Sequence, residues 1–316
     1  MGEIFAGLIV LALGAAGKAL YGFLTNHYKN SKTARDLAPY FDYQKVKASR
    51  EFFIPTKFQN QSPTQEEEPE FSHRFVSKSL LIPFFMKTAF NEKKESDKFY
   101  LVLADSGMGK TTFMINLYVQ YTSFFNFGRK HKIRLFTFGD ARILDQIKRI
   151  EPKEASDTIL LLDAFDEDKK LIPPAEPDGL SDDERFRRRL DEVIEAVQDF
   201  REVVITSRTQ YFPGQESQPY ELKIPRFDDQ GYHKLAKLYL SPFDHKEISR
   251  YLRKKFGVLR FWNRKKKQSA AIIVHNSPKL MVRPMLLSYI DYLVESKKVF
   301  KTTYQIYDYC NKTRLA

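Results

Sequence analysis

The chain has 316 residues, a length that suggests one large domain or two of modest size. Hydrophobic residues make up 42% of it, which excludes a wholly disordered protein. The 52 Lys and Arg against 40 Asp and Glu leave a net charge of +12, which favours an anionic partner such as a nucleotide, nucleic acid or acidic lipid. The single cysteine excludes an intrachain disulfide and a cysteine-based zinc site, and makes the reducing cytosol the default compartment.

The first long apolar segment, Ile4–Leu24, is a candidate membrane helix whose only formal charge is Lys18. A helix of this length covers roughly 30 Å, enough to cross the hydrocarbon core of a bilayer. Basic residues follow it at Lys29, Lys32 and Arg35, so we expect a single-pass membrane protein with the rest of the chain on the cytoplasmic side. A cytoplasmic protein, a self-associating or membrane-surface helix, a cleaved signal peptide and a buried core helix remain alternatives.

Residues 31–97 are predicted to be a linker and a region that precedes the main domain. Glu51–Lys57 favours a short strand, and the polar, acidic stretch Gln59–Glu70 favours an exposed loop. Ser77–Phe90 is apolar and either helical or extended.

From residue 98 onward, apolar runs typical of buried strands alternate with helix-forming stretches. Runs at 98–104, 133–138, 158–162 and 203–206 predict strands, and stretches at 111–123, 141–150 and beyond a capping box at Ser181 predict helices. This alternation predicts an α/β fold with a doubly wound parallel sheet over 98–245. Beyond a second capping box at Asp244 and Glu247, the candidates at 270–275, 284–295 and 303–311 predict a small helical subdomain over 246–316.

A phosphate-binding loop lies between the first of these strands and the helix after it, which is the required context. The glycines allow backbone N–H groups to turn towards phosphates, and the helix adds its positive N-terminal end. We expect Lys110 to contact the β- and γ-phosphates and the Thr111 hydroxyl to bind Mg²⁺. The first position of the motif G-x-x-x-x-G-K-[ST] holds Ala104 in place of glycine. The alternative interpretation is that Gly-Lys-Thr occurs in this loop by chance. The predicted nucleotide-binding residues are Ala104, Asp105, Ser106, Gly107, Met108, Gly109, Lys110, Thr111 and Thr112.

Acidic residues follow the strand at 158–162 and are predicted to complete the site. Asp163 is expected to hold Mg²⁺, while Asp166 and Glu167 orient or deprotonate the attacking water. The alternative is a solvated acidic turn, and Asp168 is expected at the ordinary surface.

Polar residues also follow the strand at 203–206. Thr206 or Ser207 is expected to sense the γ-phosphate, and Arg208 to offset its charge. The alternative for Arg208 is a surface or structural ion pair.

These motifs together resemble the NACHT-type NTPases, a branch of the STAND class of signalling P-loop ATPases. The match is carried first by LLLDAFDE at 160–167, where a small residue and one further residue separate Asp163 from two acids. VVITSR at 203–208 resembles the sensor strand of the family. Weaker similarity continues in three C-terminal segments: KLYLSPFDHKEISRYLRKKF, SPKLMVRPMLLSYI and TTYQIYDYC.

The resemblance implies ATP or ADP with Mg²⁺ as cofactors, and Pro284 near the adenine. It also implies slow hydrolysis used as a switch, homo-oligomerisation, and service in antiviral defence or innate immunity. ATP is expected over GTP on this resemblance, since the guanine-reading Asn-Lys-x-Asp motif is absent. Family members continue into a winged-helix domain and a repeat sensor, so we expect a longer chain or a sensor or effector partner in trans.

Two other functions compete with the switch. A basic stretch over 250–267 with interleaved aromatic residues favours a P-loop ATPase stimulated by nucleic acid, against the simpler interpretation of a solvated helix face and a basic loop. The N-terminal segment favours a protein that perturbs membranes when nucleotide gates its oligomerisation.

Overall fold

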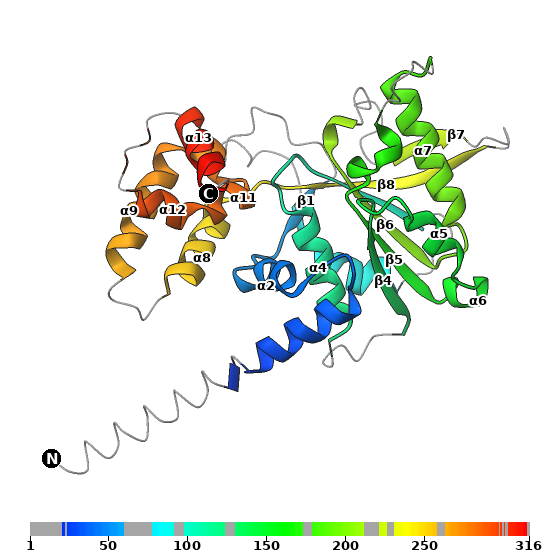
Figure 1. Cartoon of the computed structure of the whole chain (residues 1–316), viewed down its shortest axis with the longest axis horizontal. Coiled ribbons are helices and arrows are strands. Elements are labelled where there is room, and N and C mark those ends of the chain that lie inside the picture. Colours follow the sequence, from blue (N-terminus) through cyan, green and yellow to red (C-terminus); the bar gives the residue numbers. More distant parts are fainter. Residues whose placement is uncertain are drawn as a thin grey trace, which may run out of the picture. The chain divides into compact units, whose positions relative to one another are not determined.

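The structure is a computed structural model that describes residues 21–22, 24–59, 78–91, 98–123, 130–172, 179–211, 221–225, 231–257, 263–296, 298, 300 and 303–314. The chain divides into two compact units, Met1–Glu51 and Phe52–Ala316. Each unit is described by itself below, and Figure 1 gives the element labels used here.

The first unit is helical where it is described. Residues 24–36 are helical, and α2 follows at Tyr43–Glu51 with Val46 and Ser49 buried. The expected membrane helix Ile4–Leu24 lies outside the described residues except for Tyr21, Gly22 and Leu24. Over the ranges given above, no helix combines the length and the apolar character that a membrane crossing requires.

The second unit is built on an eight-stranded, mostly parallel sheet, which confirms the predicted α/β class. Five strands run parallel in the spatial order β8-β3-β6-β5-β4. Three further strands pair antiparallel at one side, β1 with β2 and β8, and β7 with β8. The bounds are β1 Lys57–Gln59, β2 Ser79–Leu80, β3 Phe99–Leu103, β4 Lys132–Thr137, β5 Thr158–Asp163, β6 Glu202–Ser207, β7 Glu221–Pro225 and β8 Tyr232–Leu240.

Helices pack on both faces of the sheet, as the apolar strands require. All six residues of β5 and of β6 are buried, which agrees with their continuous apolar sequences. Tyr100 of β3 contacts Phe85, whose ring also meets Phe113 of α4. The preceding residue, Phe99, contacts His233, which pairs with Asp191 of α7. Because successive strand residues point to opposite faces, α4 and α7 cover opposite sides of the sheet (Figure 1).

The helices of the α/β part begin and end close to the predicted positions. The capping box at Ser181 has both of its hydrogen bonds, and Phe186 and Leu190 on the apolar face of α7 are buried. Their bounds are α3 Leu81–Phe84, α4 Lys110–Tyr121, α5 Ile143–Lys148, α6 Pro152–Ala155 and α7 Asp182–Ala196; shorter turns are η1 Phe85–Ala89, η2 Phe165–Glu167, η3 Lys169–Leu171 and η4 Thr209–Tyr211.

The C-terminal part of this unit is helical, as predicted, with its own apolar core. The capping box of Asp244 and Glu247 starts α8, and the continuous helix expected over 284–295 is broken at Tyr289. Leu252, Met281 and Ile290 are among its buried residues. The helices are α8 His245–Phe256, α9 Arg264–Asn276, α10 Pro278–Met281, α11 Pro284–Ser288, α12 Ile290–Glu295 and α13 Thr303–Arg314.

Several local predictions were wrong. The strand expected over Glu51–Lys57 begins only at Lys57, because Glu51 ends α2. Gln59 is a fully buried strand residue and accepts a 2.9 Å hydrogen bond from Ser241 Oγ. The rest of the predicted loop, residues 60–70, lies outside the described residues.

Asp168 is not an ordinary surface residue. Its carboxylate Oδ2 lies 2.8 Å from Nε of Arg189 on α7, and both side chains are less than 5% exposed. Its Oδ1 accepts a hydrogen bond from the Lys170 amide at 2.9 Å. Nη1 of Arg189 also lies 2.9 Å from Oε2 of Glu192, so two carboxylates share this guanidinium. The ion pair of Asp168 and Arg189 therefore fastens the turn after β5 to α7.

We predict that Asp168→Ala lowers the free energy of unfolding by about 1–3 kcal/mol, because the buried Arg189 then keeps only its ion pair with the more exposed Glu192. Asp168→Leu combined with Arg189→Met should recover most of that loss, since no buried charge remains. Urea unfolding followed by circular dichroism measures both, with the exposed Glu151→Ala as control. A single variant that unfolds within about 0.5 kcal/mol of this control contradicts the prediction.

Candidate functional site

The loop between β3 and α4 has the backbone shape of a phosphate-binding loop. Gly107 and Gly109 have φ angles of 77° and 90°, in the left-handed region that residues with a Cβ rarely adopt. Ala104 is not among the described residues with positive φ, so its methyl group costs no strain at the motif's first position. Asp105 and Ser106 are exposed, Met108 is buried, and Gly107 and Thr112 are half-buried.

Lys110, the first residue of α4, reaches back across this loop. Its Nζ donates a 3.1 Å hydrogen bond to the carbonyl oxygen of Ala104. Burial lowers the pKa of Lys110 and Arg208 adds to this, while the carboxylates of Asp166 and Asp163 act in the opposite direction. An anion bound in the loop would offset the cost of burying this ammonium group.

Strand β6 lies between the loop strand β3 and the acidic strand β5, and brings polar groups of both together. The amide of Ala104 donates to the carbonyl of Ser207 at 3.2 Å. The Thr206 hydroxyl donates to Asp163 Oδ1 at 2.7 Å and accepts from the Ala164 amide at 2.8 Å. Thr206, expected to sense phosphate, thus holds the carboxylate at the end of the neighbouring strand.

Asp163 joins this network to the start of α4. Its side chain is 1% exposed and also accepts a hydrogen bond from the Thr111 hydroxyl. Burial raises the pKa of Asp163, while these hydroxyl donors and the charge of Lys110 counter that rise. A hydroxyl and a carboxylate side by side are hard oxygen ligands of the kind that Mg²⁺ prefers, so the two residues predicted to hold Mg²⁺ fit that ion.

The turn after Asp163 places Asp166 and Glu167 in different surroundings. Ala164 has a left-handed backbone with φ 58°, and Phe165 is fully buried between the rings of Phe138 and Phe186. Asp166 then lies inward with its side chain 1% exposed, whereas Glu167 is exposed.

Asp166 and Arg208 form an ion pair at the carboxyl ends of β5 and β6. Arg208 Nε lies 2.7 Å from Asp166 Oδ2. The other carboxylate oxygen, Oδ1, is buried and has no hydrogen-bond partner within the described part of the chain. The structural ion pair considered for Arg208 is therefore present, and it lies inside the candidate site.

The helical subdomain contacts the phosphate loop through the start of α11. The amide of Met285 donates to the carbonyl oxygen of Gly107 at 3.0 Å. A Cβ placed on Gly107 would lie 3.1 Å from Cβ of Met285, so only glycine fits here without displacement. Pro284 lies beside Gly109, with Cβ and Cγ both 4.0 Å from the position of a Cβ there.

Sequence reasoning missed Met285 and Arg283, which flank Pro284 and meet the same loop. Arg283 Nη2 lies 3.8 Å from Asp105 Oδ2, a loose ion pair between partly exposed groups. Pro284 itself was the only available signal for this contact. The structure thus brings together Asp163, Asp166, Arg208, Lys110 and Thr111, with Pro284 at the loop's other side.

The sequence matches no protein-family model and no curated protein. Solved structures that resemble the fold include the replication initiator DnaA bound to AMPPCP and single-stranded DNA, with 13% identity and a TM-score of 0.35 over 70% of this chain and 60% of that one. The Thermotoga maritima RuvB Holliday junction branch migration motor gives 13% identity and a TM-score of 0.28 over 67% of this chain and 61% of that one. The chain thus spans about 60% of the length of these two proteins.

A buried strand leads through left-handed glycines to a helix that begins with Lys110 and Thr111, and the acidic strand ends beside it. This arrangement in a parallel sheet is that of a P-loop NTPase.

Proposed function

We propose that this protein is an ATP-binding, slowly hydrolysing signalling switch of the NACHT and STAND type. The observation that carries the proposal is the bonded series Thr111, Asp163 and Thr206 beside Lys110. These bonds place the ammonium group of Lys110, the oxygens of Thr111 and Asp163, and the glycine loop at one edge of the sheet. Ligands of open α/β sheets bind at this carboxyl edge.

Phosphates would be held by the loop's backbone N–H groups and by the N-terminal end of α4. Lys110 would exchange its bond to Ala104 for the β- and γ-phosphates. Mg²⁺, when bound to Thr111 and Asp163, supplies positive charge for the phosphate oxygens. The buried Thr206 keeps the Asp163 carboxylate in place for this purpose.

For hydrolysis we assign the proton-accepting role to Asp166 rather than Glu167. Asp166 influences the charge of Lys110 and carries a buried oxygen without a hydrogen-bond partner. That oxygen is suited to accept a hydrogen bond from the attacking water. Arg208 is placed to stabilise negative charge that develops on the phosphate, which accords with its predicted catalytic role.

The switch function depends on the contact of α11 with the loop. Because the Met285 amide bonds directly to Gly107, a change of loop shape on nucleotide binding displaces the start of α11. We propose that this displacement governs homo-oligomerisation and engagement of a sensor or effector in trans. Service in antiviral defence or innate immunity stays part of this proposal on the sequence resemblance alone.

A nucleic-acid-stimulated ATPase remains a second candidate because of the basic stretch over 250–267. Several lysines in the described part of that stretch already have partners within the protein. Lys254 donates to the Phe53 carbonyl, Lys255 pairs with Asp291 and Lys266 pairs with Glu295. Hydrolysis stimulated by added DNA or RNA would favour this candidate over the switch.

We predict that Lys110→Ala weakens ATP binding by roughly 10- to 100-fold, since it removes the cation aimed at the phosphates. Isothermal titration calorimetry with ATP and Mg²⁺ measures the effect. Lys148→Ala, an exposed lysine on α5, is the matched control and should bind as the parent does. Unchanged affinity in Lys110→Ala would overturn the assignment of the loop.

We predict that Asp166→Asn lowers kcat for ATP hydrolysis by about 10²- to 10⁴-fold while ATP binding persists, because the amide no longer accepts the proton. Glu167→Gln is the matched control with the neighbouring, exposed acid, and should lose less than about tenfold. Single-turnover hydrolysis measures both rates. A larger loss in Glu167→Gln than in Asp166→Asn would reverse the two roles.

From the apolar sequence of residues 4–24, we propose that this segment anchors the protein in a membrane, with the NTPase on the cytoplasmic side. Removing residues 2–20 should transfer the protein from the membrane pellet to the supernatant, and should leave ATP affinity unchanged. Sedimentation after a high-salt wash measures this, since salt removes binding by basic residues alone. A truncated protein that still pellets is held by another segment.

A further inference from the structure

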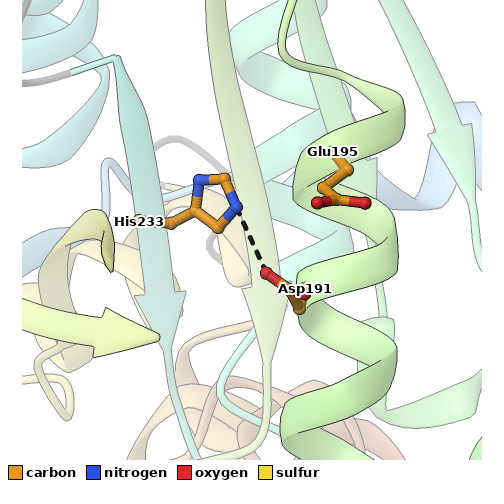
Figure 2. A group of neighbouring side chains, drawn as sticks. All are labelled: Asp191, Glu195 and His233. Atoms are coloured by element: carbon orange, nitrogen blue, oxygen red, sulfur yellow. Dashed lines mark ion pairs between the residues drawn. The ribbon is translucent and has the colours of Figure 1, made fainter. Parts of the chain in front are cut away.

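Three side chains that the nucleotide site does not use converge between α7 and β8. They are Asp191 and Glu195 of α7 and His233 of β8, and the ligand atoms they offer all lie within 4.8 Å of one another. Asp191 and His233 are 2% and 9% exposed, and Glu195 is exposed. Figure 2 shows the Asp191 carboxylate pointing to the imidazole ring, with Glu195 one turn further along the same helix.

The sequence positions explain this convergence. Asp191 and Glu195 are four residues apart, so one helical turn places them on the same face of α7. His233 is the second residue of β8 and lies on the sheet face that α7 covers. The group therefore joins a helix to a strand that follows it by about forty residues.

From these distances and this chemistry, we infer that Asp191, Glu195 and His233 form a binding site for a divalent first-row transition ion, with Zn²⁺ as the first candidate. Asp191 and Glu195 are like charges one turn apart on α7, and a cation bound between them offsets their repulsion. Two carboxylates and an imidazole nitrogen are ligands that a divalent first-row ion binds.

The geometry of the buried pair suits such an ion. His233 Nε2 lies 3.2 Å from Asp191 Oδ1, close to the roughly 3.3 Å that separates two ligands on a tetrahedral Zn²⁺ with bonds of about 2.0–2.1 Å. The Glu195 carboxylate lies within 4.8 Å of the other two ligand atoms. Its side chain is exposed, so a rotation can bring one of its oxygens into bonding distance of the ion. Three protein ligands leave a fourth position for water.

The donor set also selects the class of ion. Ca²⁺ and Mg²⁺ take oxygen ligands, whereas imidazole nitrogen suits Zn²⁺ and its neighbours in the first row. The cluster lies towards the amino ends of the parallel strands, about six residues or ~20 Å along β8 from the level of the phosphate loop. The ion would thus stabilise the joint of α7 and β8 without contacting nucleotide.

The test uses the full chain, freed of any affinity tag, stripped with EDTA and dialysed. Titration with Zn²⁺ in buffer containing millimolar Mg²⁺ should give one saturable site, and Zn²⁺ should raise the melting temperature by mass action. Glu195→Gln should bind Zn²⁺ at least about tenfold more weakly, since even removal of an outer-shell partner costs that much. This variant alters an exposed side chain, so it tests the site without disturbing the core.

Two control variants and one further variant complete the test. Glu151→Gln and His275→Gln change exposed residues of the same types elsewhere and should bind Zn²⁺ as the parent does. Lys110→Ala should bind Zn²⁺ as the parent does while binding ATP more weakly, which separates this site from the nucleotide site. Failure of the parent to bind Zn²⁺ saturably, or undiminished affinity in Glu195→Gln, would overturn the inference and leave Asp191 and His233 as an ion pair alone.

Discussion

The hydroxyl of Thr206 is the interaction on which the candidate site depends. It donates to Asp163 and accepts from the amide of Ala164, so a single side chain fixes both the carboxylate and the start of the turn that carries Asp166. Thr206 can make both bonds only because β6 lies between β3, which leads into the loop, and β5, which ends at Asp163. Without this hydroxyl, the buried Asp163 would lose a hydrogen bond that offsets its burial.

The turn after Asp163 shows how backbone conformation assigns chemistry to neighbouring residues. Ala164 has a left-handed backbone conformation and starts the turn. The buried ring of Phe165 then packs against Phe138 and Phe186 and holds the turn in place. Asp166 and Glu167 are adjacent acids in the sequence, yet one lies inside against Arg208 and the other faces solvent. The small side chain at position 164 is therefore a backbone requirement, since a bulky or β-branched residue is strained in this region.

Much of the fold and the loop could be predicted because their signals are local. Capping boxes, continuous apolar strands and a glycine loop each depend on a few consecutive residues, and the structure has them at 181, 244 and 107–109. Strand order depends on pairing between distant segments, so the position of β6 and the bonding of Thr206 did not follow from the sequence. The prediction for Asp168 failed for a related reason: this residue looks like a charged surface residue until its partner Arg189 is known. Strand β7 and its pairing with β8 also escaped prediction, because Glu221 and Lys223 interrupt the apolar pattern of β7.

The hydrogen bond between Met285 and Gly107 has a thermodynamic consequence for whatever binds the helical subdomain. If nucleotide and a partner each favour a different position of α11, their binding free energies are coupled through this one contact. Linkage makes that coupling reciprocal, so a partner that weakens ATP binding tenfold is itself bound tenfold more weakly when ATP is present. Such a partner lowers nucleotide occupancy at equilibrium without touching the nucleotide site.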